Sequence, residues 1–156
     1  MNKTNAMRML DKAKIKYETK EYIPDENDLS GTHVAEQIGL PCECVFKTLT
    51  ARGDKTGVVV FCIPSNKELD LKKAAKVSKN KGVELLHVKD LLGVTGYIRG
   101  GCSPIGMKKA YPTYIDITAV SFEKITVSAG VKGCQLLLDP NELINFVNAE
   151  CFELTH

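Results

Sequence analysis

The sequence lacks the long apolar run that a membrane-spanning helix requires. Its longest strongly hydrophobic stretch, Val58–Ile63, is far shorter than the roughly 18 residues of such a helix. The first residues, Met1–Asn5, are polar and do not begin the apolar core of a signal peptide. We therefore expect a cytoplasmic protein that does not use a membrane as a partner.

Three common catalytic motifs are also missing. The segment Gly101–Lys108 approximates a phosphate-binding loop, but lysine and then serine or threonine do not directly follow its second glycine. His33 and Glu36 lack the second histidine of a zinc-protease helix, and no Gly-x-Ser-x-Gly elbow is present. These absences argue against a nucleoside triphosphatase, a zinc protease and a serine hydrolase, and we expect no cofactor.

Six cysteines are present, but their spacing does not form a zinc site, because Cys42 and Cys44 have no matching second pair. Without an export signal, a disulfide framework is also not expected. We predict reduced thiols, several of them packed inside strands as small hydrophobic groups, and no metal site.

With 156 residues and no repeat or linker, residues 1–156 are expected to form a single domain. Helices are predicted after the capping residues Thr4, Thr32, Asp70 and Asp139. Arg52–Lys55 has the composition of a hairpin turn, and the following apolar strand should be central. Helices between many short strands indicate an α/β (α+β) fold, with a mixed six- to seven-stranded barrel-like sheet flanked by helices.

The charge is unevenly distributed along the chain. Residues 67–109 hold ten lysines and arginines against four acids, whereas residues 18–28 hold five acids and one lysine. This asymmetry suits a polyanion bound across one face, although a solvated lysine-rich helix face would give the same pattern.

Two features remain as candidates for chemistry. Lys47 shares a strand face with Val45 and Leu49, so its cation points where apolar side chains point; it either meets an anion or extends to water at a sheet edge. The segment Gly96–Pro104 contains paired glycines, which can turn successive N–H groups toward one point or simply form a tight turn.

Taken together, the chain resembles a known family through four segments in fixed order: Val45–Leu49, Leu71–Lys76, Thr95–Tyr97 with the loop Gly100–Pro104, and Val127–Gly130. These segments are similar to those of the YbaK family of trans-editing deacylases, relatives of the editing domain of bacterial prolyl-tRNA synthetases. The resemblance covers nearly the full chain. It implies hydrolytic release of cysteine mischarged onto tRNA(Pro), with transfer RNA as the partner, prolyl-tRNA synthetase as a further partner, and no DNA.

The resemblance also implies the roles of particular residues. Lys47 is expected to be the essential lysine that holds the terminal adenosine or phosphate region, and Gly100 and Gly101 to shape the aminoacyl pocket. The substrate's own thiol is expected to attack the ester, with amides of residues 100–103 stabilising the oxyanion. The remaining substrate contacts are expected from Tyr22, Phe46, Cys102, Ser103, Pro104, Ser128, Gly130 and Asp139.

Several alternatives stay open at the level of sequence. Cys102 is either a packing residue or a protein nucleophile, and Asp139 is explained equally well as a helix cap. The amino acid released is cysteine or another small residue, as in Ala-tRNA(Pro). A non-catalytic tRNA- or nucleotide-binding module would use the same lysine-rich face, and a cysteine-based redox or metal protein is a more distant alternative.

Overall fold

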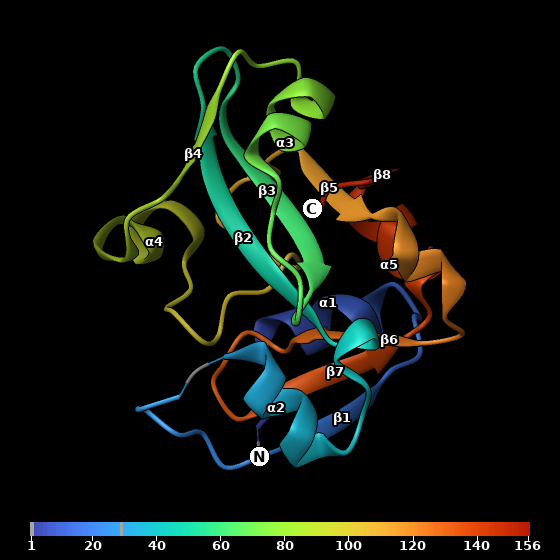
Figure 1. The fold of residues 1–156 in the computed structure, drawn as a ribbon. Helices are drawn as coiled ribbons and strands as arrows, with labels where there is room; N and C mark the ends of the chain where they lie inside the picture. The colour runs from blue at the N-terminus through green and yellow to red at the C-terminus, as the bar shows by residue number, and fades with distance from the viewer. Residues whose placement is uncertain (1, 29) are drawn as a thin grey trace.

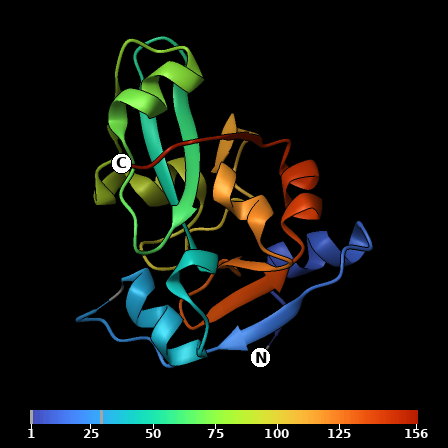
Figure 2. The same ribbon diagram turned by 45° about the vertical axis from the view of Figure 1, so that its right-hand side comes forward.

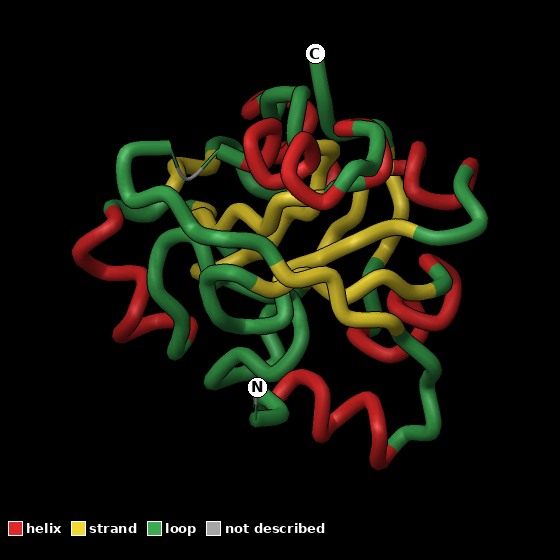
Figure 3. The backbone as a smooth tube through the Cα atoms, turned by 90° about the horizontal axis from the view of Figure 1, so that it is seen from below, coloured by secondary structure: helices red, strands yellow, loops and turns green. Residues whose placement is uncertain are grey.

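The structure is a computed structural model that describes residues 2–28 and 30–156. Within these residues, five α-helices surround two β-sheets (Figure 1). Seen from below, the strands occupy the centre of the molecule and the helices its periphery (Figure 3). No helix in the described ranges has both the length and the apolar character needed to cross a membrane.

The larger sheet contains the predicted hairpin. The strands β2 (Phe46–Gly53) and β3 (Gly57–Pro64) pair antiparallel around the turn at residues 54–56. As predicted, β3 is the middle strand of the five-stranded sheet, and its apolar side chains are buried on both faces of that sheet. The strand order is β4 (Val83–Leu85), β2, β3, β5 (Thr113–Asp116) and β8 (Glu150–Phe152).

The smaller sheet is an antiparallel set with the order β1 (Glu18–Glu21), β7 (Cys134–Leu138) and β6 (Ile125–Ser128). One isolated bridge, between Val45 and Thr126, joins it to the larger sheet. The mixed α/β class is confirmed, but the described strands number eight in two sheets, and the barrel-like closure is not confirmed. The strand pattern of the sequence predicts where strands lie but not which strands pair. Among the described residues, β1 pairs with β7 alone.

The helices begin largely where the sequence predicts. Thr4 caps α1 by accepting a hydrogen bond from the N–H of Met7, and Asp70 and Asp139 cap their helices in the same way. The prediction of Thr32 as a cap is wrong, because Ser30 accepts from the N–H of His33 at 3.3 Å and Thr32 lies inside the helix. The bounds are α1 Asn5–Lys12, α2 Gly31–Ile38, α3 Leu71–Ser78, α4 Val88–Thr95 and α5 Pro140–Val147, with short 3₁₀ helices at Cys42–Cys44 and Ile117–Ser121.

Two apolar cores lie on opposite faces of the β2–β3 hairpin. Phe46 and Cys62 belong to the larger core, together with residues of α1, α5 and the small sheet. Phe61 and Ile63 belong to the smaller core beneath α3. The last residues of the chain cross to the α3 side, where Leu69 and Thr155 form a bridge (Figure 2). The two faces of β2 therefore have different surroundings.

The six cysteines all lie in the described part of the chain and are free thiols, as predicted. Cys62, Cys134 and Cys151 are strand residues. Cys62 and Cys134 are at most 1% exposed and pack in the larger core, where each acts as a small hydrophobic group.

Candidate functional site

Lys47 lies where the two sheets meet. The bridge between Val45 and Thr126 is parallel, and Lys47 and Ser128 each follow it by two residues, so that strand alternation puts both side chains on the same face. The intervening residues, Phe46 and Val127, both point into the larger core, as this alternation requires. Lys47 and Ser128 therefore share the opposite face of the junction, away from that core.

The Lys47 side chain is partly buried, and its cross-strand neighbour is the fully buried Ile63. Burial lowers the pKa of Lys47, and the carboxylate of Glu68 opposes this shift. Among the described residues, Lys47 forms no ion pair. A partly desolvated ammonium group without a close carboxylate is suited to an anion or a polarised oxygen from a ligand.

A short polar row extends from Ser128 across the small sheet. Ser128 stands opposite Gln135 in register, and Thr126 donates to the side-chain oxygen of Gln135 at 3.1 Å. Both Thr126 and Gln135 are buried. Neither residue is among the predicted site residues, although the amide of Gln135 within the otherwise apolar strand Cys134–Leu138 is a signal in the sequence.

The glycine-rich loop approaches the chain just after Ser128. A Cβ atom at Gly101 would lie 3.2 Å from backbone atoms of Val131 and Lys132, so the position has no room for a side chain without displacement of backbone. Gly130 has φ +100° and lies against the ring of Tyr97, where a Cβ atom would come within 3.0 Å. The glycine loop therefore packs against the residues that directly follow Ser128.

The loop amides are not all free. The N–H of Gly101 donates to the carbonyl of Ile98 at 3.0 Å, so it is not available to a ligand. The N–H groups of Cys102 and Ser103 have no hydrogen-bond partner among the described residues. The predicted set of oxyanion donors is thus reduced to the N–H groups of Gly100, Cys102 and Ser103, which have no partner among the described residues.

The side chains of Phe46 and Cys102 lie on the other face of β2. Phe46 is 2% exposed and packs in the larger core. Burial raises the pKa of the Cys102 thiol to about 11, while the hydroxyls of Thr50 and Thr95 oppose the shift. Because Thr50 shares a strand face with Phe46, the thiol lies on that side. It is protonated at neutral pH and is not an activated nucleophile.

The other predicted contacts divide between two locations. Tyr22 lies at the same end of the small sheet as Ser128, since its N–H donates to the carbonyl of Gly133 at 2.9 Å. Ser103 is fully buried, and its hydroxyl accepts from the N–H of Ile105 at 3.3 Å. Tyr22 thus lies beside the small sheet and Ser103 lies within the loop. Each of them uses one polar group in a hydrogen bond that belongs to the fold.

Pro104 and Asp139 are not brought beside Lys47. Pro104 lines a separate hollow of about 210 Å³ that also includes Met9 and Phe146. Asp139 caps α5 beyond the end of β7 that is remote from Gln135, and its carboxylate accepts from the N–H of Asn141 at 2.8 Å. The cap accounts for Asp139 without a substrate.

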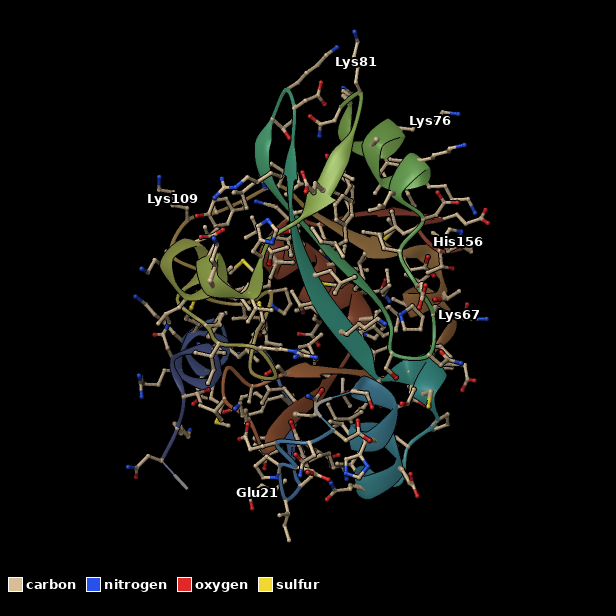
Figure 4. The ribbon with its side chains drawn as sticks, turned by 60° about the vertical axis from the view of Figure 1, so that its left-hand side comes forward. Glu21, Lys67, Lys76, Lys81, Lys109 and His156 are labelled. Atoms are coloured by element: carbon tan, nitrogen blue, oxygen red, sulfur yellow. The ribbon has the colours of Figure 1, made fainter. Side chains whose placement is uncertain are left out.

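A larger groove, of about 1160 Å³, lies between α1 and β1 and contains none of the predicted site residues. Figure 4 shows Lys76 and Lys81 towards one end of the molecule, Glu21 at the other, and Lys67 and Lys109 between them. The lysines of residues 67–109 are therefore spread over the molecule and are not gathered at one end.

Comparison with known proteins gives a consistent result. A family model described as "Aminoacyl-tRNA editing domain" matches residues 29–146. The protein named "Putative Cys-tRNA(Pro)/Cys-tRNA(Cys) deacylase EbsC" from Enterococcus faecalis is 52% identical over 153 residues, which cover 98% of this chain and 93% of that protein. The uncharacterized protein YwhH from Bacillus subtilis is 27% identical over 112 residues, covering 72% of this chain and 71% of that protein.

The fold is also shared with solved structures. A structure titled as a putative trans-editing enzyme for prolyl tRNA synthetase has a TM-score of 0.83, with 20% identity and 99% coverage of both chains. The hypothetical protein APE2540 has a TM-score of 0.86, with 19% identity, 96% coverage of this chain and 97% of its own. At these identities, the similarity concerns the fold.

Proposed function

The chain belongs to the aminoacyl-tRNA editing domain family, and on that premise we propose that it hydrolyses the ester of cysteine mischarged onto tRNA(Pro). The observation that carries this proposal is the 52% identity, over nearly the whole chain, to the Enterococcus protein named as a deacylase of that substrate. The reaction is editing in trans, and residues 1–156 act as a single domain. The geometry around Lys47 supports the same reaction.

Lys47 binds the 3′-terminal nucleotide through its ammonium group. Among the described residues the partly buried cation has no carboxylate within ion-pair distance and feels Glu68 only from further away, so a phosphate or ribose oxygen supplies the close interaction that the fold does not. Ser128, beside Lys47, and Gln135, across from Ser128, present polar groups on the same face for the ribose or the aminoacyl group. Tyr22 and Gly130 border this face at the end of the small sheet.

The substrate supplies the nucleophile. The cysteine thiol attacks its own ester carbonyl, so that a sulfur–carbon bond forms, the bond to the ribose oxygen breaks, and the thiol proton passes to that oxygen. The cyclic thioester that leaves is then hydrolysed by water. Holding the thiol in attack geometry is worth up to roughly 7–11 kcal/mol.

The glycine loop stabilises the charge that develops on the carbonyl oxygen. The unpartnered N–H groups of Gly100 and Cys102, which are partly exposed, are the donors in this proposal, and Gly101 packs against the segment Val131–Lys132. One such donor typically contributes about 3 kcal/mol to a transition state. Pre-ordered backbone amides thus stabilise the oxyanion, while the substrate thiol supplies the nucleophile.

Cys102 is not the nucleophile in this account, and replacing it by alanine tests that point. We expect Cys102→Ala to keep kcat/KM for Cys-tRNA(Pro) within about threefold, a difference below 1 kcal/mol, across pH 6–9. The reason is that a thiol with a pKa near 11 holds its proton throughout this range. A loss of activity comparable to that of an active-site knockout, in a folded variant, would identify Cys102 as a reacting group.

The experiment that tests the proposed function is a deacylation assay with purified protein. Cys-tRNA(Pro) carrying labelled cysteine should lose its label far faster than the spontaneous rate. Salt-dependent binding of the tRNA without loss of the ester would instead indicate the non-catalytic binding module. Association with prolyl-tRNA synthetase is part of the proposal, since the domain presents no evident element for reading bases, and co-purification of the two proteins tests it.

A further inference from the structure

The end of the β2–β3 hairpin carries a compact group of lysines. Lys55 lies in the hairpin turn, and Lys79 and Lys81 lie in the segment between α3 and β4; we call these three residues the hairpin tip. All three side chains are exposed. Figure 4 shows Lys81 projecting from this end of the molecule, with Lys76 of α3 nearby.

A buried asparagine holds the two segments of the tip together. The side-chain oxygen of Asn80 accepts from the N–H groups of Lys55 and Thr56 at 2.9 and 3.0 Å. Its amide nitrogen donates to the hydroxyls of Thr56 and Ser78. Gly53 leaves the space that this amide occupies, because a Cβ atom there would lie 2.1 Å from it. The tip is therefore ordered before any ligand arrives.

The hairpin tip keeps an excess of positive charge. None of its three lysines forms an ion pair with a described residue, whereas the neighbouring Lys73 pairs with Glu153 at 2.9 Å. The nearest acid in sequence, Asp54, accepts from the N–H groups of Gly82 and Lys81; these bonds and the positive charge of Lys55 lower its pKa, so Asp54 offsets part of the charge of the tip. Asp54 thus serves to join the two segments.

Lys79 occupies a backbone conformation that favours glycine. It ends α3 with φ +64°, while the corresponding positions after α2 and α4 are Gly39 and Gly96. A lysine at such a position costs stability that glycine would not. A charged side chain therefore occupies a position in the hairpin tip at which the backbone conformation alone would favour glycine.

We propose that the hairpin tip binds the phosphate backbone of the acceptor stem of the substrate tRNA, an inference that rests on the proposed function. Six residues of extended strand lead from Lys47 to Gly53, or about 20 Å at 3.3 Å per residue, and Lys55 lies beyond them in the turn. With the ester beside Lys47, this distance takes the tip beyond the single-stranded 3′ end to the duplex. Lysines act as point charges toward phosphates, and the tip has no aromatic residue on which a base could stack.

The tip therefore contributes affinity without selecting among tRNAs, because phosphate contacts carry no sequence information. The test is a triple variant, Lys55→Gln, Lys79→Gln and Lys81→Gln, in the full chain. We expect the Kd for uncharged tRNA(Pro) to rise about tenfold or more, and the slope of log K against log salt to fall by about 2–3. Hydrolysis of the cysteinyl ester of adenosine, which cannot reach the tip, should be unchanged.

A matched control carries the same change of charge elsewhere: Lys12→Gln, Lys16→Gln and Lys124→Gln, on and near α1. This control should keep the wild-type Kd and salt slope. Equal effects of the two triple variants, or a loss confined to the control, would overturn the inference; the second result would place the RNA in the groove between α1 and β1. Failure of the wild-type protein to hydrolyse any ester would instead refute the proposed function.

A single substitution separates charge from folding. Lys79→Gly removes one cation and relieves the left-handed backbone conformation, so we expect a higher Tm together with weaker tRNA binding and a salt slope lower by about 1. Unchanged binding by this more stable variant would count against the tip as a docking surface.

Discussion

Replacing Lys47 by methionine should abolish deacylation of Cys-tRNA(Pro) without unfolding the protein. We expect kcat/KM to fall by on the order of 10²–10³ or more, as when a charged or hydrogen-bonding group is removed from a developing transition state. Methionine retains most of the length of the side chain and fills the partly buried position beside Ile63. Single-turnover deacylation and a thermal melt of the same sample make the measurement.

The stability part of this prediction follows from the pKa of Lys47. Burial places that pKa below its value in an unfolded chain, so the ionised lysine destabilises the fold at neutral pH. This cost disappears as the pH rises through the lowered pKa, and the methionine variant does not have it at any pH. The variant should therefore melt at the wild-type Tm or above it near pH 7.

The control is Lys16→Met, which removes an exposed lysine from the segment between α1 and β1. It should retain wild-type activity. Wild-type rates in the folded Lys47 variant would remove Lys47 from the site, and a loss of activity that accompanies unfolding in both variants would reduce its role to stability.

The second large effect concerns the amino acid on the tRNA. We expect Cys-tRNA(Pro) to be hydrolysed at least about 10³-fold faster than Ala-tRNA(Pro), because alanine has no thiol to attack the ester and loses the intramolecular advantage. Discrimination by pocket size alone is worth only about 10–200-fold for a difference of one methylene. Parallel deacylation assays on the two esters, with trapping of the cyclic thioester, give the ratio and the intermediate.

A protein that hydrolysed both esters at similar rates would exclude the substrate-assisted step while leaving the deacylase in place. In that case, water would have to be the direct nucleophile. Ser-tRNA(Pro) is the control nearest in shape, since a hydroxyl replaces the thiol. We expect it to resemble the alanine ester, because a hydroxyl is a weak nucleophile without a base to activate it.

The sequence predicts the elements of this fold well where the signal is local. The cap at Asp139 followed by Pro140, the hairpin turn before Gly57 and the doubly buried strand β3 all depend on residues within one short segment. The arrangement of strands into two sheets depends instead on contacts between residues far apart in the chain. The single bridge between Val45 and Thr126 has no local signature.

The same distinction applies to the candidate site. The exceptional positions of Lys47 and the paired glycines are visible in the sequence, because a cation and glycines interrupt an apolar pattern. The side on which Phe46, Cys102 and Pro104 lie is not visible, and these side chains face away from Lys47. The commitment of the Gly101 amide to Ile98 likewise depends on the bend of the loop.

The most direct test of the account is to locate the bound 3′ end. An analogue in which cysteine is joined to 3′-amino-adenosine by a stable amide can be titrated into the labelled protein and followed by amide chemical shifts. We predict the largest changes at Lys47, Gly100, Cys102 and Ser128. Changes confined to the groove between α1 and β1, or to the hollow lined by Met9 and Phe146, would contradict the site proposed for this chain.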